Sequence, residues 1–458
     1  MFSWRFLAAA TLLVRATAQS STCAAPTVTI TNGTYVGLSV PNYGQEFFLG
    51  IPYAQPPLGD LRFAIPHPLN ATWPGTHNAT AYYPECVGYG GDDIGYQVSE
   101  DCLALNVIRP AGYEGQSLPV AVWIHGGGYV MGGTPDRRYN LTFMVQNSVT
   151  IGKPIIGVSL AYRLSGWGFL DGAEIRAAGA TNLGIRDQYL ALQWLQENIA
   201  AFGGNPSKVT IWGESAGGES VGSLLTLYGG RDDKLFAGAI SESGTPLLQG
   251  GIYSESIGQA KYDNITAATG CSNASNSLSC LRSLPFDTLN KALNITPSYL
   301  FSPYVDNDTI KGSIYEQLLK GQFIKVPYLI GTNADEGSAF GPQGVNNDTA
   351  FEAYLNTTGA DYETVKTLEI IYPNIDALGV LDTYNATPPA DVPGTQFKRV
   401  AAFAGDYTFI AARRLTCQQW TKYGVNAYAY RFNVIVNNLT ALIGVTHFQA
   451  RRPPRTVM

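Results

Sequence analysis

Short hydrophobic runs alternate with stretches of helical periodicity along most of this chain. Between two such runs, residues 184–199 place Leu192, Leu195 and Ile199 at helical spacing, and Asn182 stands where it can cap that helix. Strand and helix in alternation predict an α/β fold with a mostly parallel central sheet flanked by helices. The hydrophobic runs predicted to form strands are 103–108, 120–124, 155–160, 209–212, 326–330 and 427–432.

The middle of the chain, at about residues 250–308, is rich in Ser, Thr and Asn. No linker composition flanks it, so we expect an excursion over the sheet rather than a separate domain. No repeat is evident apart from a doubled pentapeptide that is discussed below.

The first residues have the layout of a secretory signal peptide. Arg5 supplies an early positive charge, an apolar stretch follows at 6–14, and Ala16-Thr17-Ala18 offers a cleavage site. We therefore expect a signal peptide at 1–18 and a catalytic domain at 19–449. No later segment is apolar over the roughly 20 residues that a membrane helix needs, so stable membrane insertion is not expected.

Charge and cysteine content agree with an exported protein. The formal net charge of −6 argues against nucleic acid as a partner, because phosphate binding needs a basic surface. The local pairs Cys86–Cys102 and Cys271–Cys280 are predicted to form disulfides, and Cys23 and Cys417 are left without an assigned partner. No Cys/His spacing suggests a metal site. Sites for N-linked glycans are predicted at Asn32, Asn70, Asn78, Asn140, Asn264, Asn273, Asn294, Asn307, Asn347, Asn356, Asn385 and Asn438.

The pattern Gly-x-Ser-x-Gly occurs twice in succession, around Ser215 and around Ser220. A nucleophilic serine of this type sits on a sharp turn between a strand and a helix. Ser215 follows the run 209–212 directly, with Gly213 and Glu214 left for the turn. Ser220 lies five residues later, inside the predicted helix and about 140° around it. Ser215 is therefore the predicted nucleophile.

A serine nucleophile needs a base, and the chain has only four histidines. His67 and His77 lie in a polar stretch that predicts solvated loops. His125 opens a His-Gly-Gly-Gly stretch after a strand, whose backbone N–H groups suit a developing oxyanion. His447 is left as the predicted base.

The acid that orients the base is expected after the serine, before the histidine and just past a strand. The turn after 326–330 offers both Asp335 and Glu336. Spacing alone does not choose between them.

Together these features resemble the type B carboxylesterases and lipases, the cholinesterase-like α/β-hydrolases, and secreted fungal members in particular. The likeness extends over nearly the whole chain after the signal peptide. It is carried by the stretches 48–54, 56–59, 61–63, 99–103, 125–128, 182–184, 187–188, 202–206, 213–217 and 335–337.

The resemblance implies a role for each matching residue. Ser215 would be the nucleophile, Glu336 the acid and His447 the base, and Ser243 would stand behind the acid. The oxyanion hole would be formed by the N–H groups of Gly127, Gly128 and Ala216. The family also bridges the cysteines that match Cys86–Cys102 and Cys271–Cys280, and its acyl transfer uses no cofactor.

The chain departs from the family pattern in two places. The loop between Cys86 and Cys102 is short and has no Trp, whereas lipases carry a long lid there and cholinesterases a tryptophan. We therefore expect a small-molecule ester of small or medium size as substrate. The likeness ends near Gln449, and the basic tail 450–458 matches nothing in the family, which suggests a truncated C-terminal part.

Two alternatives remain open at this point. One is a lipase that acts on acylglycerols. The other is an inactive, truncated family member that serves as a binding module.

Overall fold

The computed structural model describes most of the chain. The described residues are 25–247, 255–295, 301–381, 384, 386–391, 393–436 and 440–449. Several predicted features lie outside this part: the signal peptide at 1–18, Cys23, the glycan sites Asn385 and Asn438, and the tail 450–458.

The main sheet of the described chain has nine strands in the order β14-β13-β12-β11-β9-β10-β8-β4-β3. Strands β10, β9, β11, β12, β13 and β14 are parallel, whereas β8, β4 and β3 pair antiparallel at one side. The strands of this sheet are β3 (Leu38–Val40), β4 (Gln45–Pro52), β8 (Ala104–Pro110), β9 (Leu118–Ile124), β10 (Ile156–Leu160), β11 (Gly204–Glu214), β12 (Gly238–Glu242), β13 (Tyr328–Asn333) and β14 (Ala427–Phe432).

Two smaller sheets accompany the main sheet in the described chain. They are formed by β1 (Thr27–Thr29), β2 (Thr34–Val36) and β5 (Thr76–Asn78), and by the pair β6 (Glu85–Cys86) and β7 (Val98–Ser99). Every strand predicted from the hydrophobic runs is present, within a few residues of its predicted limits except at β11, which begins earlier.

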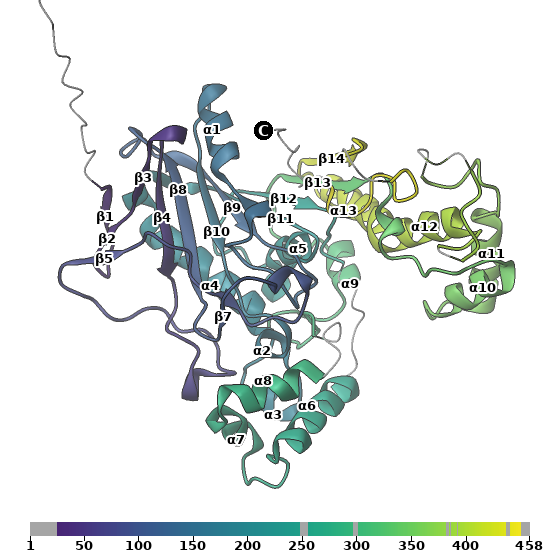
Figure 1. Cartoon of the computed structure of the whole chain (residues 1–458), viewed down its shortest axis with the longest axis horizontal. Coiled ribbons are helices and arrows are strands. Elements are labelled where there is room, and N and C mark those ends of the chain that lie inside the picture. Colours follow the sequence, from purple (N-terminus) through teal and green to yellow (C-terminus); the bar gives the residue numbers. More distant parts are fainter. Residues whose placement is uncertain are drawn as a thin grey trace, which may run out of the picture.

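Helices cover both faces of the main sheet, so the fold is the α/β architecture that the alternation predicted (Figure 1). Strands β8 and β10 are buried along their whole length, because helices and loops exclude water from both of their faces. The helices are α1 (Thr142–Thr150), α2 (Ser165–Phe169), α3 (Ala173–Ala177), α4 (Leu183–Asn198), α5 (Ala216–Gly230), α6 (Glu255–Thr269), α7 (Ser277–Ser283), α8 (Phe286–Ile295), α9 (Ile314–Leu319), α10 (Asp348–Asn356), α11 (Tyr362–Ile371), α12 (Phe397–Gly405) and α13 (Ala411–Lys422).

Helix α4 forms where predicted, but Asn182 does not cap it with its side chain. Asn182 adopts a left-handed backbone conformation with φ 49°. Its buried amide donates hydrogen bonds to Tyr304 O at 2.8 Å and Thr309 Oγ1 at 3.1 Å. The expected side-chain cap is therefore wrong, because the Asn182 side chain bonds the distant segment at Tyr304 and Thr309 instead of the first turn of α4.

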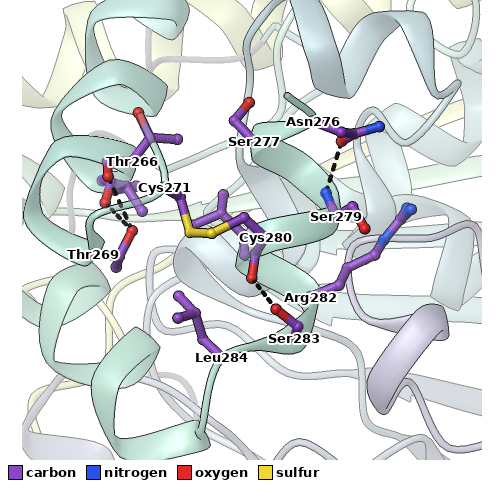
Figure 2. The surroundings of a disulfide bond; sticks show 12 residues. Thr266, Thr269, Cys271, Asn276, Ser277, Ser279, Cys280, Arg282, Ser283 and Leu284 are labelled. Carbon is purple, nitrogen blue, oxygen red and sulfur yellow. Dashed lines mark hydrogen bonds between the residues drawn. A yellow bond between two sulfur atoms is a disulfide. The ribbon is translucent and has the colours of Figure 1, made fainter. Parts of the chain in front are cut away.

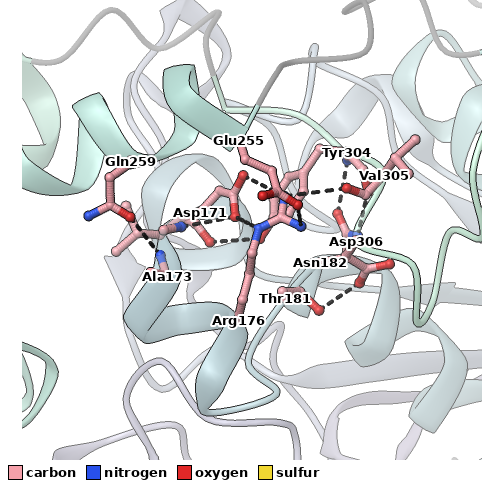
Figure 3. A network of polar contacts seen from close by, with 12 residues as sticks. Asp171, Ala173, Arg176, Thr181, Asn182, Glu255, Gln259, Tyr304, Val305 and Asp306 are labelled. Atoms are coloured by element: carbon pink, nitrogen blue, oxygen red, sulfur yellow. Dashed lines mark hydrogen bonds and ion pairs between the residues drawn. The ribbon is translucent and has the colours of Figure 1, made fainter.

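The Ser/Thr/Asn-rich middle of the chain forms α6, α7 and α8, whose buried leucines and isoleucines join the main hydrophobic core. The disulfide Cys271–Cys280 closes the turn between α6 and α7, and Asn276 caps α7 by accepting from Ser279 N at 2.8 Å (Figure 2). Arg176 on α3 pairs with Asp171 at 2.7 Å and with Glu255 on α6 at 3.2 Å (Figure 3). These contacts hold the middle segment against α3 and the body of the fold.

Helices α10, α11 and α12 gather at the right-hand end of Figure 1, beyond α13, which packs against β13 and β14. They share a small core of their own, formed by Val345, Phe351, Leu355, Val365, Val400 and Phe403. A π-helical turn, Asp406–Ile410, joins α12 to α13. This turn and the Glu336–Ser338 turn after β13 lie side by side, and they bring the C-terminal third of the chain to the candidate site.

Candidate active site

Ser215 sits on the turn between β11 and α5, at the carboxyl end of the central strands. Its backbone is in the strained region, with φ 57° and ψ −127°, which is rare for a residue with a side chain. A Cβ at Gly213 would overlap the backbone of Gly217, and one at Gly217 would overlap the carbonyl oxygen of Ile124. The two glycines are therefore needed for the chain to turn this tightly. The strand runs on to Glu214, so the turn is even sharper than the sequence predicted.

Ser220 lies inside α5, as predicted, and is fully buried. Its hydroxyl accepts a hydrogen bond from Gln188 Nε2 on α4 at 2.9 Å. This contact joins the two helices and keeps Ser220 away from solvent.

His447 lies between Ser215 and Glu336, although the three residues are far apart in sequence. Its Nε2 is 2.9 Å from Ser215 Oγ and its Nδ1 is 2.7 Å from Glu336 Oε2. The loop that carries His447 is held by Asn333, whose side-chain amide donates to Thr446 O at 2.7 Å. In this order, the imidazole can take the proton of the serine hydroxyl while the carboxylate holds the imidazole in place.

The carboxylate of Glu336 is fully buried, and its second oxygen is also occupied. Oε1 accepts from Ser243 Oγ at 2.5 Å and from Asn333 N at 2.6 Å. Asp335 points elsewhere, because its carboxylate accepts from Val445 N at 2.6 Å and Leu381 N at 3.0 Å. Of the two candidates left open by spacing, Glu336 is thus the one that contacts His447.

A second carboxylate approaches the imidazole from the opposite side. Glu214, which is buried, places Oε1 3.4 Å from His447 Nε2. Burial lowers the pKa of His447, but Glu214 and Glu336 outweigh this effect and raise the pKa of the imidazole above its usual value. Sequence reasoning missed Glu214, although it is one of the two variable residues of the Gly-x-Ser-x-Gly pattern itself.

Two phenylalanine rings enclose the His447 ring. Phe409, from the π-helical turn, stacks on it with ring centroids 4.9 Å apart, and Phe340 meets it edge-on at the same distance. Phe409 is buried, whereas Phe340 is about half exposed. Neither ring was predicted, since no sequence pattern links these positions to the histidine.

The loop Gly126–Gly133, which we call the glycine loop, packs directly against the serine. A Cβ at Gly126 would lie 3.1 Å from Ser215 Cβ and 2.5 Å from Glu214 O. Within the described ranges, the N–H groups of Gly127 and Gly128 donate no hydrogen bond to a protein oxygen. Ala216 is the first residue of α5, and its N–H has no acceptor within the helix. The three predicted oxyanion donors therefore belong to segments that meet at Ser215.

The other three histidines differ in their surroundings. His125 is buried, stacks on Tyr162 with centroids 4.5 Å apart, and has a pKa lowered to about 4, mainly because of burial. His77 is exposed, as expected, but it lies in β5 rather than in a loop and stacks on Trp73 with ring centroids 4.4 Å apart. His67 is partly exposed.

Both predicted disulfides, Cys86–Cys102 and Cys271–Cys280, are present. Cys417 forms no disulfide with another described cysteine. Among the described residues, no group of three or more His, Cys, Asp or Glu side chains is placed to hold a metal ion. In the same part of the chain, no helix has both the length and the apolar character to span a bilayer.

Comparison with known proteins places this geometry in context. The profile of the carboxylesterase family matches residues 24–449. Secreted lipase 1 of Botryotinia fuckeliana is 38% identical over 94% of this chain and 80% of its own length. The cholinesterase of Mus musculus is 35% identical over 88% of this chain and 69% of its own length. The crystal structure of Aspergillus niger EstA superposes with a TM-score of 0.80 at 31% identity, covering 93% of this chain and 81% of that one.

Proposed function

The chain belongs to the carboxylesterase family and is a carboxylic ester hydrolase, and we propose that it cleaves esters through an acyl-enzyme on Ser215. The observation that carries this proposal is the position of His447, with Nε2 2.9 Å from Ser215 Oγ and Nδ1 2.7 Å from Glu336. Hydrogen-bond distances of this kind allow the imidazole to take the serine proton during attack.

In the proposed reaction, Ser215 Oγ attacks the ester carbonyl and His447 Nε2 accepts the hydroxyl proton. The carboxylate of Glu336 stabilises the imidazolium that forms and keeps its orientation. His447 then gives the proton to the departing alcohol, which leaves the acyl group on Ser215. A water molecule then attacks the acyl group while His447 takes its proton. His447 returns this proton to Ser215 Oγ as the acid leaves.

The negative charge of the tetrahedral intermediate needs donors that are already in place. We assign this role to the N–H groups of Gly127, Gly128 and Ala216, because their segments meet at Ser215. Loss of one such donor typically lowers turnover by about 10²–10³.

We propose esters of small or medium size as substrates. The loop from Cys86 to Cys102 is short, so no long lid covers the serine from this position. Lipases stand among the relatives, which makes acylglycerol hydrolysis the second candidate. Two assays separate an esterase from a lipase. On p-nitrophenyl esters of increasing chain length, we expect the rate of hydrolysis to fall beyond medium chains. On tributyrin, we expect no rise in rate when the substrate forms an emulsion.

The central test is hydrolysis of p-nitrophenyl butyrate by the full chain beside Ser215→Ala and Ser220→Ala. We expect Ser215→Ala to lower kcat by a factor on the order of 10⁶. Ser220→Ala removes the bond to Gln188, and we expect it to lower the free energy of unfolding by about 1 kcal/mol while turnover stays within a few-fold. Turnover lost in Ser220→Ala alone would reject our assignment, and an inert but folded wild-type chain would favour a binding module.

We also propose that the protein is secreted and carries N-linked glycans. Secreted lipases are among the relatives, and the two disulfides suit an oxidising compartment. Several predicted glycan sites are exposed on the surface, among them Asn70, Asn78, Asn264 and Asn356. A mass shift on deglycosylation of protein recovered from the culture medium tests both statements.

A further inference from the structure

The disulfide loop (residues 86–102) lies directly on the glycine loop (residues 126–133), and two hydrogen bonds join the loops, one between their backbones and one through the side chain of Asp93. Tyr89 N donates to Val130 O at 2.6 Å. Gly132 N donates to Asp93 Oδ1 at 2.8 Å, and the other oxygen of Asp93 accepts from Gly90 N at 3.2 Å. Asp93 therefore links the backbone of one loop to the backbone of the other.

The two loops are packed without free space between them. A Cβ at Gly88 would lie 2.7 Å from Val130 O and 2.8 Å from Asp93 Oδ2. A Cβ at Gly90 would overlap the side chain of Met131. Only glycine allows this approach at both positions, so the contact is built into the disulfide loop.

Hydrogen bonds inside the glycine loop connect the residues that contact the disulfide loop to Gly127. The carbonyl oxygen of Gly127 accepts from Val130 N at 3.1 Å and from Met131 N at 3.2 Å. Gly127 has φ 97° and Gly128 has φ 65°, conformations that suit glycine. Residues 130 and 131 therefore close the turn that carries the N–H groups of Gly127 and Gly128. The disulfide loop contacts both of these closing residues.

The disulfide loop is itself anchored to the body of the fold. The bond Cys86–Cys102 closes it at its base. The hydroxyl of Tyr89 accepts from Trp167 Nε1 at 2.9 Å and donates to Asn290 Oδ1 at 2.8 Å. A loop that is closed by a disulfide and anchored again through Tyr89 is suited to fix its neighbour, and a lid would have to break these bonds to open.

We propose that the disulfide loop braces the glycine loop, with Asp93 as the positioning residue that keeps the N–H donors of Gly127 and Gly128 in place. This inference rests on the proposed function, because it assigns those two N–H groups to the oxyanion. The brace acts on the transition state: substrate binds before the oxyanion forms, so a loosened loop weakens stabilisation of the intermediate more than it weakens binding.

The test compares Asp93→Ala and Asp93→Asn with Asp101→Ala as a matched control. Asp101 lies in the same disulfide loop, but its carboxylate accepts from Tyr83 Oη at 3.0 Å rather than from the glycine loop. Steady-state kinetics with p-nitrophenyl butyrate give kcat and KM. Hydrogen exchange followed by mass spectrometry reports the protection of peptides that cover residues 126–133, whether or not the enzyme turns over.

We expect Asp93→Ala to lower kcat by about 10- to 100-fold with KM within about twofold, and to speed exchange in residues 126–133 by at least about tenfold. Asp93→Asn keeps one acceptor for Gly132 N, so it should recover much of both losses. Asp101→Ala should leave exchange in the glycine loop unchanged.

Unchanged exchange in Asp93→Ala would overturn the brace. Faster exchange with normal kcat would overturn the positioning role. If the wild-type chain hydrolysed no ester, the proposed function would fail, and the exchange experiment would still decide whether Asp93 holds the glycine loop.

Discussion

Glu214 precedes Ser215 in the chain, yet its carboxylate lies 3.4 Å from Nε2 of His447, the nitrogen that also faces Ser215 Oγ. The imidazole therefore lies between two acidic side chains, Glu214 and Glu336, each of which favours its protonated form. This arrangement would stabilise the imidazolium that forms in the proposed reaction. It also requires a higher pH before the imidazole is neutral and able to act as a base.

We accordingly predict that Glu214→Gln makes the enzyme active at lower pH. Removal of this charge lowers the pKa of His447, so the acid limb of the pH profile of kcat/KM should shift to lower pH by about 1 pH unit. The maximal rate should fall, because the imidazolium loses one stabilising charge. Glu197→Gln, an exposed substitution on α4, should leave the limb in place. An acid limb that stays fixed or rises in Glu214→Gln would contradict the assignment.

The tight approach at the serine turn leads to a prediction about stability. Gly217→Ala places a methyl group into the carbonyl oxygen of Ile124, which is backbone and has little room to move. We expect a loss of about 1–3 kcal/mol in the free energy of unfolding, measured with urea, together with a marked fall in kcat as Ser215 shifts.

Gly115→Ala is the matched control for this substitution, because a Cβ there meets nothing within 4 Å. Equal stability of the two alanine variants would show that the serine turn tolerates a Cβ after all.

Glu85 gives a prediction about pH and stability. Its carboxylate is fully buried beside Gly133, and the pKa is raised to about 8 by burial first and by Asp93, Asp136 and Asp92 next. In the unfolded chain this group ionises near its ordinary pKa. The stability that it contributes is therefore complete below that pKa, is lost as pH rises, and is gone above about 8.

Glu85→Gln carries no ionisable group, so its free energy of unfolding should fall less between pH 5 and pH 9 than that of the wild type. We expect the difference between the two proteins to grow by about 1–3 kcal/mol over this range, which allows for solvent screening. Urea titrations at pH 5, 7 and 9 measure it. Curves that stay parallel would show that Glu85 does not ionise as described.

Features carried by neighbouring residues were accessible from the sequence. The strand, the turn and the helix around Ser215 lie within one continuous stretch, so the choice of Ser215 over Ser220 followed from local geometry. Six of the nine strands of the described main sheet were likewise visible as hydrophobic runs, whereas β3, β4 and β12 were not predicted. Burial on both faces demands apolar residues along the whole strand, as in β8 and β10. A scarcity of histidines, rather than any pattern, singled out His447.

Features that depend on distant residues were decided only by the tertiary structure. Asp335 and Glu336 are adjacent and chemically alike, and what separates them is that Val445 N and Leu381 N face one while His447 faces the other. The same holds for Asn182, which bonds Tyr304 instead of capping its helix, and for Asp93, which bonds Gly132. Side-chain direction after a turn depends on which partners the fold brings near. A local sequence pattern contains no record of partners that lie 39 to 122 positions away.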